Sequence, residues 1–456
     1  MLSNLFFMAA LMYSQVGGPP TSTVPTADTK PADVPASGKD AADPAAEDKK
    51  DEEKKEDEKP AADKWLFMRA LEGTFLGSAM DSRRLSFSGW LHQSFTTGTA
   101  TTNNLPIGGN VPIVWNDRNN RYAMQQLWGR LERSVDTEAS HMTIGGRADI
   151  LFGTDYRYTL MRGLFNGQLG AAAPNQMWYG FDLPQFYGNV YLPNFLNGVD
   201  LKIGRMFCPW GVESIEAVSS PFLTKSYAFN WAPPFTHFGV MATVNVSDQL
   251  QAVAMLVNGN DVWVDQTTQQ QRFVGKLQYT GREKKQTISV AATLGRAVFD
   301  TSSPFAPITF GLQTEPFGRN NLNAVDVVYT RKMRERFSTA VELIYGWQYA
   351  NPALAVPGFT AGGFASWFAS ALYGFLDITE HWKAQVRGEI FLDAQGQRTG
   401  FLGTYYAGTA GLVFTPRKAL QIRPEIRWDY NGQSTPFDNG TRNNLFVGAI
   451  DAIIRY

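Results

Sequence analysis

The chain has 456 residues, of which 18% are charged, against roughly 25% in soluble globular domains. Its formal net charge is −1, but residues 27–64 carry thirteen acids and eight lysines (net −5), whereas residues 65–456 carry 29 acids and 33 lysines and arginines (net +4). The sequence has no cluster of basic residues interleaved with aromatics, which argues against a nucleic-acid partner, and its single cysteine, Cys208, excludes a disulfide framework within the chain and a multi-cysteine metal site.

The first eighteen residues are expected to be a secretory signal peptide. Leu5–Tyr13 is an apolar run of nine residues, too short to span a bilayer, and the small residues Ser14, Gly17 and Gly18 follow it. A basic region before the run is missing, so either the α-amino group supplies the only positive charge or the true start lies upstream. An ordinary buried N-terminus is the alternative reading of this stretch.

Residues 19–64 are expected to be a disordered spacer on the periplasmic side. The segment is rich in Pro, Ala, Asp, Glu and Lys, and between Pro19 and Asp63 only Val24 and Val34 are larger apolar residues. Such a composition buries too little apolar surface to offset the entropy of ordering the chain. Contact with cell-wall material is the alternative role for it.

From residue 83 onward the sequence alternates between apolar and polar residues, which is the pattern of β-strands. In residues 419–430, for example, one face carries Leu420, Ile422, Ile426, Trp428 and Tyr430, and the other carries Gln421, Arg423, Glu425, Arg427 and Asp429. A soluble sandwich would show the same alternation. Aromatics at the ends of the apolar faces, runs of charge on the opposite faces and an amphipathic last strand, 444–456, favour a membrane barrel instead.

Candidate strands start near residues 83, 121, 141, 182, 198, 235, 249, 271, 286, 322, 336, 364, 381, 404, 419 and 445, which makes sixteen. The predicted fold is therefore all-β, a transmembrane antiparallel β-barrel over residues 65–456 with about sixteen strands, fourteen and eighteen remaining open. A sheet in lipid must close because lipid cannot satisfy the hydrogen bonds of a free edge. Sixteen strands leave an aqueous lumen.

The uncharged stretch Leu343–Leu376 is read as a hairpin rather than a spanning helix, because Pro352, Pro357 and Gly362-Gly363 interrupt it. The connections alternate in length, as expected when one end of the barrel faces the periplasm. Short polar turns are expected at 247–249, 280–286, 379–381 and 415–419, and long Gly/Pro/Asn-rich connections at 98–120, 155–181, 207–234, 299–321 and 350–363. Long loops without structure usually have a function.

One stretch carries a family resemblance. Residues 201–246 contain Gly204-Arg205, a turn Pro209-Trp210-Gly211-Val212-Glu213, then Ser220-Pro221-Phe222, Lys225-Ser226-Tyr227 and Pro234-Phe235-Thr236-His237-Phe238-Gly239-Val240. This succession resembles the bacterial putative β-barrel porin family of outer-membrane proteins. The resemblance implies a passive outer-membrane channel in a bacterium with two membranes; Cys208 in the turn and the charged spacer depart from the family pattern.

The same stretch is a candidate constriction loop, residues 207–234, that folds into the bore. Its many aromatics need burial while its polar groups need water. Residues singled out for it are Arg205, Pro209, Gly211, Glu213, Lys225, Tyr227 and His237. An extracellular cap that never narrows the pore is the alternative.

No catalytic chemistry is evident. The four histidines have no metal-ligand spacing, and the sequence has no Gly-x-Ser-x-Gly elbow, P-loop or dinucleotide fingerprint, so no enzyme activity, metal or cofactor is expected. Charges of both signs on the polar faces are expected to line the pore, namely Arg130, Glu132, Arg147, Asp149, Lys383, Arg387, Glu389, Arg423, Glu425, Arg427 and Asp429. Opposite charges two residues apart should partly neutralise one another.

The predicted function is an outer-membrane porin for passive diffusion of small polar solutes with weak charge selectivity, since a selective channel would show a ring of one sign. The alternative is a plugged barrel acting as a surface adhesin or a barrel enzyme. Expected partners are outer-membrane lipids, the barrel-assembly machinery and the solutes. The machinery would recognise Phe446 and Tyr456 of the last strand as an insertion signal. A homotrimer is left open.

Overall fold

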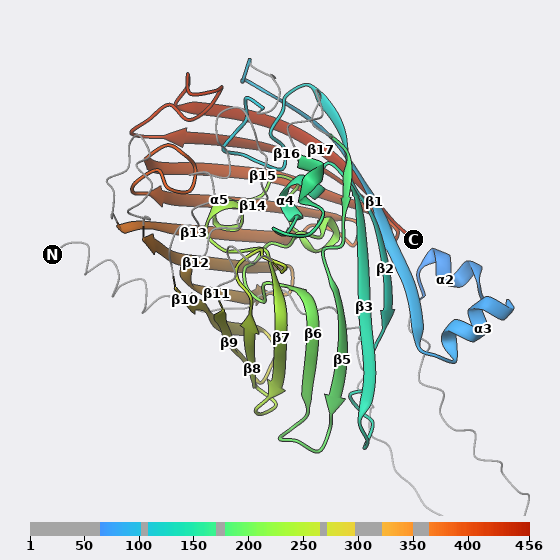
Figure 1. Ribbon diagram of the computed structural model, residues 1–456. Coiled ribbons are helices and arrows are strands. Elements are labelled where there is room, and N and C mark those ends of the chain that lie inside the picture. The colour runs from blue at the N-terminus through green and yellow to red at the C-terminus, as the bar shows by residue number, and fades with distance from the viewer. Residues whose placement is uncertain (1–63, 102–107, 170–177, 265–270, 297–321, 350–363) are drawn as a thin grey trace, which may run out of the picture.

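The computed structural model describes residues 64–101, 108–169, 178–264, 271–296, 322–349 and 364–456 (Figure 1). The expected signal peptide and, apart from Lys64, the expected spacer lie outside the described residues, as do the connections 299–321 and 350–363. In the described part of the chain, no helix is both long and apolar enough to cross a membrane.

Strands make up most of the described chain. They are β1 (Leu85–Gly98), β2 (Arg121–Arg133), β3 (Thr143–Gly153), β4 (Gly180–Asp182), β5 (Phe186–Leu192), β6 (Val199–Phe207), β7 (Thr236–Asn245), β8 (Leu250–Val257), β9 (Arg272–Thr280), β10 (Gln286–Gly295), β11 (Asn323–Arg334), β12 (Phe337–Tyr349), β13 (Phe364–Asp377), β14 (Trp382–Asp393), β15 (Gly403–Arg417), β16 (Leu420–Asn431) and β17 (Asn444–Arg455). The helices are short: α2 (Leu66–Ala70), α3 (Phe75–Asp81), α4 (Tyr156–Thr159) and α5 (Tyr227–Trp231), with 3-10 turns η1 (Asn166–Leu169) and η2 (Ala217–Ser219).

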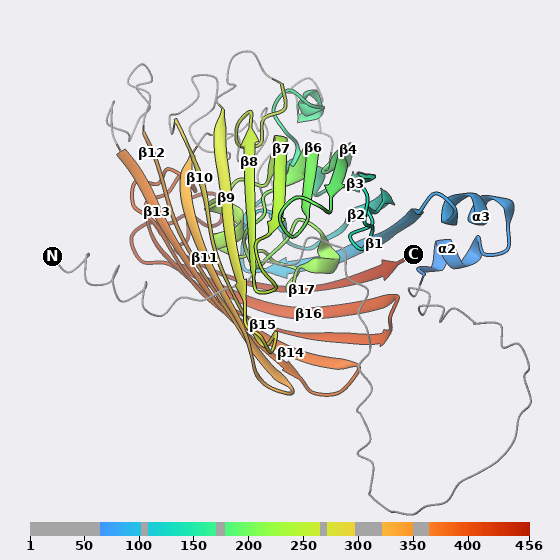
Figure 2. The same cartoon turned by 90° about the horizontal axis from the view of Figure 1, so that it is seen from below.

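The strands form one closed antiparallel barrel (Figures 1 and 2). Strand β1 pairs with β2 on one side and with β17 on the other, from Trp90 opposite Arg455 to Gly98 opposite Val447, and this pairing closes the sheet. Both β4 and β5 pair with β3, at successive positions along it, so they are two pieces of one barrel strand. The seventeen strands of the described residues therefore occupy sixteen positions, as predicted.

The observed strand starts agree with the predicted ones to within two residues, except where the fourth strand is split into β4 and β5. The uncharged stretch does form a hairpin, β12 and β13, with the turn between them outside the described residues. Helices α2 and α3, which precede the first strand, were not predicted. They stand outside the barrel wall, beside the end of β17 (Figures 1 and 2).

The most exposed apolar side chains of the strands point outward. On β16, for example, Ile426 is 54% exposed, whereas the neighbouring Arg427 is 1% exposed and faces the lumen. A soluble sandwich would bury the apolar side chains instead, so this arrangement identifies the outer surface as the lipid-facing one. The wall has a short-turn end, which also holds the start of β1 and the end of β17, and a long-loop end.

Candidate functional site

The connection between β6 and β7 runs inside the barrel. We call residues 208–235 the inner segment; most of its side chains are buried, and Phe222, Tyr227 and Trp231 are almost inaccessible to solvent. Its helix α5 packs against β12, β13 and β14 of the wall (Figure 1). Apolar side chains thus gather in the lumen of a barrel whose outer surface is also apolar, because the segment forms one core with inward-facing apolar side chains of the wall, such as Trp367.

Local sequence signals shape the inner segment. The backbone of Gly211 has a φ of +95°, a region that favours glycine. Ser226 caps α5, since its hydroxyl oxygen accepts a hydrogen bond from the backbone N–H of Phe229 at 3.0 Å. Pro233 and Pro234 follow α5 and cannot continue it. These residues explain why the chain turns inward, forms one helical turn and returns to β7.

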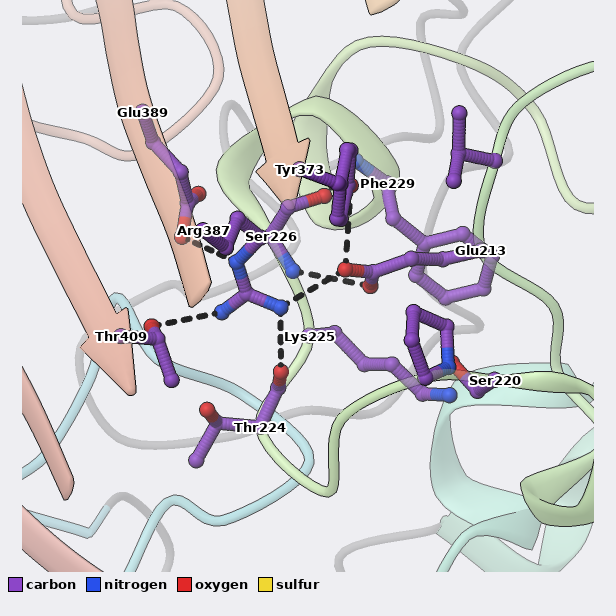
Figure 3. Close-up of polar contacts among 12 residues, drawn as sticks. Glu213, Ser220, Thr224, Lys225, Ser226, Phe229, Tyr373, Arg387, Glu389 and Thr409 are labelled. Atoms are coloured by element: carbon purple, nitrogen blue, oxygen red, sulfur yellow. Dashed lines mark hydrogen bonds and ion pairs between the residues drawn. The ribbon is translucent and has the colours of Figure 1, made fainter. Parts of the chain in front are cut away.

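An ion pair at the centre of the site joins the inner segment to β14 (Figure 3). Nη1 of Arg387 lies 2.7 Å from the Glu213 carboxylate and also donates to the Thr224 carbonyl oxygen at 2.8 Å. The same carboxylate accepts hydrogen bonds from the Tyr373 hydroxyl at 3.1 Å and from the backbone N–H of Ser226 at 2.9 Å. Both charges are buried, and each has several partners, which is the condition for a stable buried pair.

Wall carboxylates hold the backbone of the inner segment. Glu425 accepts hydrogen bonds from the backbone N–H groups of Leu223 and Thr224, at 2.8 and 2.9 Å. Three further wall acids each accept one such bond: Glu389 from Tyr227, Glu342 from Val212 and Asp326 from Gly211. Buried N–H groups need acceptors, and bonds to carboxylates are stronger than neutral ones.

Side-chain donors hold the segment from β2 and β3, across the lumen from β11 to β14. Glu216 contacts Arg147 at 2.7 Å and also contacts Arg130. Gln126 of β2 donates to the Ile215 carbonyl oxygen at 2.8 Å. Arg423 of β16, between these two sides, donates to the Ser220 carbonyl oxygen at 2.5 Å. The inner segment is therefore attached on both sides of the lumen, and a cap lying only outside the barrel is not what these contacts describe.

The predicted pairing of charges two residues apart holds for some pairs. Arg147 and Asp149 lie 2.6 Å apart, and the pairs Arg387–Glu389 and Arg427–Asp429 each lie 2.7 Å apart. Arg130 and Arg423 make their direct ion pairs across strands instead. Arg130 contacts Asp149 at 3.2 Å and Arg423 contacts Asp451 at 2.5 Å, each directly opposite on the neighbouring strand. Opposite residues are closer than the roughly 6.6 Å between i and i+2, which is why the cross-strand partner prevails.

Two of the predicted pore-lining residues lie apart from the inner segment. Lys383 is near the short-turn end, with its side chain 45% exposed, and contacts Asp377 at 3.3 Å. Glu132 lines a chamber between the inner segment and the wall. The other nine lie on β2, β3, β14 and β16. Most of them contact the inner segment, or contact a wall residue that does so.

The residues predicted for the constriction loop do not all act together. Arg205 is fully buried on β6 and contacts Asp182 at 2.7 Å and the Thr159 carbonyl oxygen at 2.5 Å, so it holds the chain around α4. His237 is buried on β7, with Nδ1 3.1 Å from the Gly259 carbonyl oxygen. Pro209 and Gly211 form the turn after β6.

Lys225 and Tyr227 lie within the inner segment, as does Glu213. Nζ of Lys225 donates to the Ser214 carbonyl oxygen at 2.7 Å, and burial lowers the pKa of Lys225 to about 8. The Tyr227 ring stacks on Phe391, with ring centroids 5.8 Å apart. These side chains therefore stabilise the inner segment in its inward position.

A chamber of about 430 Å³ lies between the inner segment and the wall, reaching the short-turn end of β3 to β9. Its charged lining comprises Arg133, Arg147, Lys202 and Lys276 together with Glu132, Asp200, Glu213, Glu216 and Glu342. Sequence reasoning missed six of these nine residues, namely Arg133, Asp200, Lys202, Glu216, Lys276 and Glu342. A lone acid in an apolar strand, as in Val341-Glu342-Leu343, is the signal that would have found the last of them.

The terminal aromatics point outward. Phe446 is 45% exposed on β17. The Tyr456 hydroxyl reaches across β1 and donates to the Trp128 carbonyl oxygen at 2.8 Å. The Tyr456 backbone N–H donates to the Gly89 carbonyl oxygen at 2.9 Å. The last residue therefore covers the seam where the barrel closes.

Solved porins share this fold. The outer-membrane channel DcaP of Acinetobacter baumannii aligns with a TM-score of 0.53 at 10% identity, covering 82% of this chain and 97% of its own. An anion-selective porin from Comamonas acidovorans (TM-score 0.51, 9% identity) and a loop-deletion mutant of OmpT from Vibrio cholerae (0.52, 11%) each cover 82% of this chain and 99% of their own. At these identities the similarity shows the fold alone.

Sequence comparison places the chain in a family. No curated protein is similar enough in sequence to be matched. The family model described as putative beta-barrel porin-2, OmpL-like, matches residues 84–456, which is the whole barrel without the helices before it. The chain therefore belongs to the putative β-barrel porin-2, OmpL-like family, and its barrel is that of a bacterial outer-membrane porin.

Proposed function

We propose that the protein is a non-enzymatic outer-membrane pore through which small polar solutes diffuse passively, and that the inner segment narrows that pore. The observation that carries the proposal is the attachment of the inner segment to both sides of the lumen, through Glu213 and Glu216 on the segment and Arg387 and Arg147 on the wall. A segment held in this way reduces the free cross-section to the part of the lumen that it does not fill. We propose that the chamber beside it is part of that remaining path.

Weak charge selectivity is part of the proposal. Most wall charges are neutralised within contacts to the inner segment or to each other, and the chamber lining carries four basic and five acidic residues. A ring of one sign would favour one class of ion. Mixed signs at these positions favour neither strongly, unlike the Comamonas acidovorans protein, which is described as anion-selective.

We further propose how the protein is placed in the cell envelope. Outer-membrane lipids contact the outward apolar faces, and the assembly machinery recognises the last strand through Phe446 and Tyr456. The charged spacer lies in the periplasm, after removal of the signal peptide. A homotrimer is proposed because one OmpT structure of similar fold is described as a trimer form.

The test is electrical. Replacing Val212–Phe229 by a short Gly-Ser linker should raise single-channel conductance in planar bilayers several-fold, because the obstruction is removed, while the reversal potential in a salt gradient stays near zero. Unchanged conductance would contradict the constriction. Absence of any current or liposome swelling from correctly folded wild-type protein would contradict the pore itself and favour a plugged adhesin or enzyme.

A further inference from the structure

Helices α2 and α3 form a small hairpin that no part of the pore requires. We call residues 64–82 the rim hairpin; it precedes β1 and stands outside the wall at the short-turn end, beside the C-terminus (Figures 1 and 2). Lys64 fastens it together, with Nζ 2.8 Å from Asp81 and 3.8 Å from Glu72. The hairpin is thus an ordered element with its own internal contacts.

The rim hairpin is attached to the barrel through apolar side chains. The Phe67 ring lies 4.8 Å from the Phe87 ring of β1 in an edge-to-face arrangement, and the buried Met68 contacts the backbone of Phe87. At the rim itself the Arg455 guanidinium lies 5.6 Å from the Trp65 ring. These contacts fix the hairpin against the seam between β1 and β17.

The attachment point belongs to the lipid-facing surface. Phe87 is paired with Leu131 of β2, an outward side chain that is 45% exposed. The Phe87 ring also lies 6.4 Å from the ring of Tyr456, which covers the seam from outside. Residues that contact Phe87 therefore lie at the edge of the membrane rather than in the lumen.

The rim hairpin exposes large apolar side chains that its own fold does not bury. Phe75 is 90% exposed, Leu76 53% and Leu66 50%. Helices of five and seven residues are too short to cover such side chains by themselves. Large exposed apolar patches mark sites that bind lipid or another protein.

We infer that the rim hairpin lies in the lipid interface of the leaflet at the short-turn end, with Leu66, Phe75 and Leu76 inserted among phospholipid chains. The hairpin that carries these side chains adjoins the lipid-facing belt of the barrel, since Phe67 contacts Phe87 and Phe87 contacts Tyr456. Short amphipathic helices with aromatic and basic residues bind at this depth. The hairpin would thereby hold the start of the barrel domain, which follows the spacer in the sequence, at the membrane surface.

Site-specific fluorescence tests the inference with the full-length barrel in liposomes. An environment-sensitive dye is attached at Phe75→Cys in a Cys208→Ala background, and the liposomes contain phosphatidylcholine and phosphatidylglycerol with a fraction of lipids that carry a quencher. Ser78→Cys, an exposed polar position on the same helix, is the matched control. Heat-dependent mobility in gels verifies that each labelled protein is folded.

The dye at position 75 should emit at shorter wavelength and be quenched by the modified lipids, whereas the dye at position 78 should respond more strongly to aqueous iodide. Equal iodide quenching at both positions would overturn the inference. The inference would also be overturned if a second copy of the chain, rather than lipid, covered these side chains. In that case the fluorescence at position 75 would change when unlabelled protein is added at constant lipid. Channel conductance plays no part in this readout, so its outcome is independent of the proposed pore.

Discussion

Arg387 of the wall and Glu213 of the inner segment form an ion pair at 2.7 Å in which neither side chain is accessible to solvent. The two residues are 174 positions apart in the sequence. Their contact explains how a polar barrel lumen can hold an apolar segment: the wall charges satisfy the segment's buried charge and backbone, while its aromatics also pack against inward-facing apolar side chains of the wall, as Tyr227 does against Phe391.

Replacing Arg387 by Met should release the inner segment. The substitution leaves Glu213 buried without its cation, which typically costs about 3–5 kcal/mol. Single-channel recordings should show larger and noisier conductance than the wild type, and the double variant R387M/E213Q should recover part of the difference. Lys383→Met is the control, because Lys383 lies on the same strand but is 45% exposed; an equal change in both variants would argue against a specific role for the pair.

Asp155 should make the stability of the folded barrel depend on pH. Burial raises the pKa of Asp155 to about 7 from the ordinary 3.8, although a hydrogen bond from Gln126 at 2.8 Å opposes the shift. The folded state therefore binds this proton more tightly than the unfolded state, so the stabilisation is full below about pH 4 and is lost as the pH rises through about 7, by at most about 1.4 kcal/mol per pH unit.

Urea unfolding in detergent micelles at several pH values between 4 and 8 measures this effect. In Asp155→Asn, whose side chain does not titrate, the fall in stability across that window should be smaller than in the wild type. The comparison with the wild type removes the contribution of other groups. Parallel curves for the two proteins would show that Asp155 does not titrate in this range.

The two lysines of the chamber should set its charge balance. Lys202 and Lys276 line the chamber on β6 and β9, and the double variant K202E/K276E changes the local charge by −4, two units at each position. The reversal potential in a potassium chloride gradient should move from near zero toward that of a cation-selective pore, since cations are attracted to a lining of negative sign. Lys285→Glu, on an exposed turn, is the control. If the reversal potential of K202E/K276E equals that of the wild type, the conducting path lies elsewhere.

The seam should depend on a glycine. A Cβ atom at Gly89 would lie 2.1 Å from the Trp128 carbonyl oxygen and 2.7 Å from the Tyr456 ring, so Gly89→Ala forces the backbone or the ring to move, at a cost of about 1–3 kcal/mol. The folded fraction, measured by heat-dependent mobility in membrane extracts, should fall. Gly408→Ala is the matched control, because no atom lies within 4 Å of its Cβ position; equal folding of the two variants would show that Tyr456 does not need Gly89.

Much of the barrel could be predicted from the sequence. In an extended strand, side chains alternate between the two faces, so the order Ile426, Arg427, Trp428, Asp429 already states which residues meet lipid and which meet the lumen. The Gly, Pro, Asn and Asp residues of the turns also showed where each strand ends, because their effect on the backbone is local. The split of the fourth strand and the rim hairpin were not predicted, because neither has a long periodic pattern.

The partners of the lumen charges could not be predicted in the same way. Whether Arg423 contacts Glu425, two residues along the strand, or Asp451, opposite on β17, depends on the register between strands, and whether Glu213 contacts Arg387 depends on where a long connection folds. The sequence by itself thus determined the strands and the face on which each side chain lies, because that periodicity is local. Only the tertiary structure decided which charges neutralise one another and that the connection after β6 occupies the lumen, because those contacts join residues that are distant along the chain.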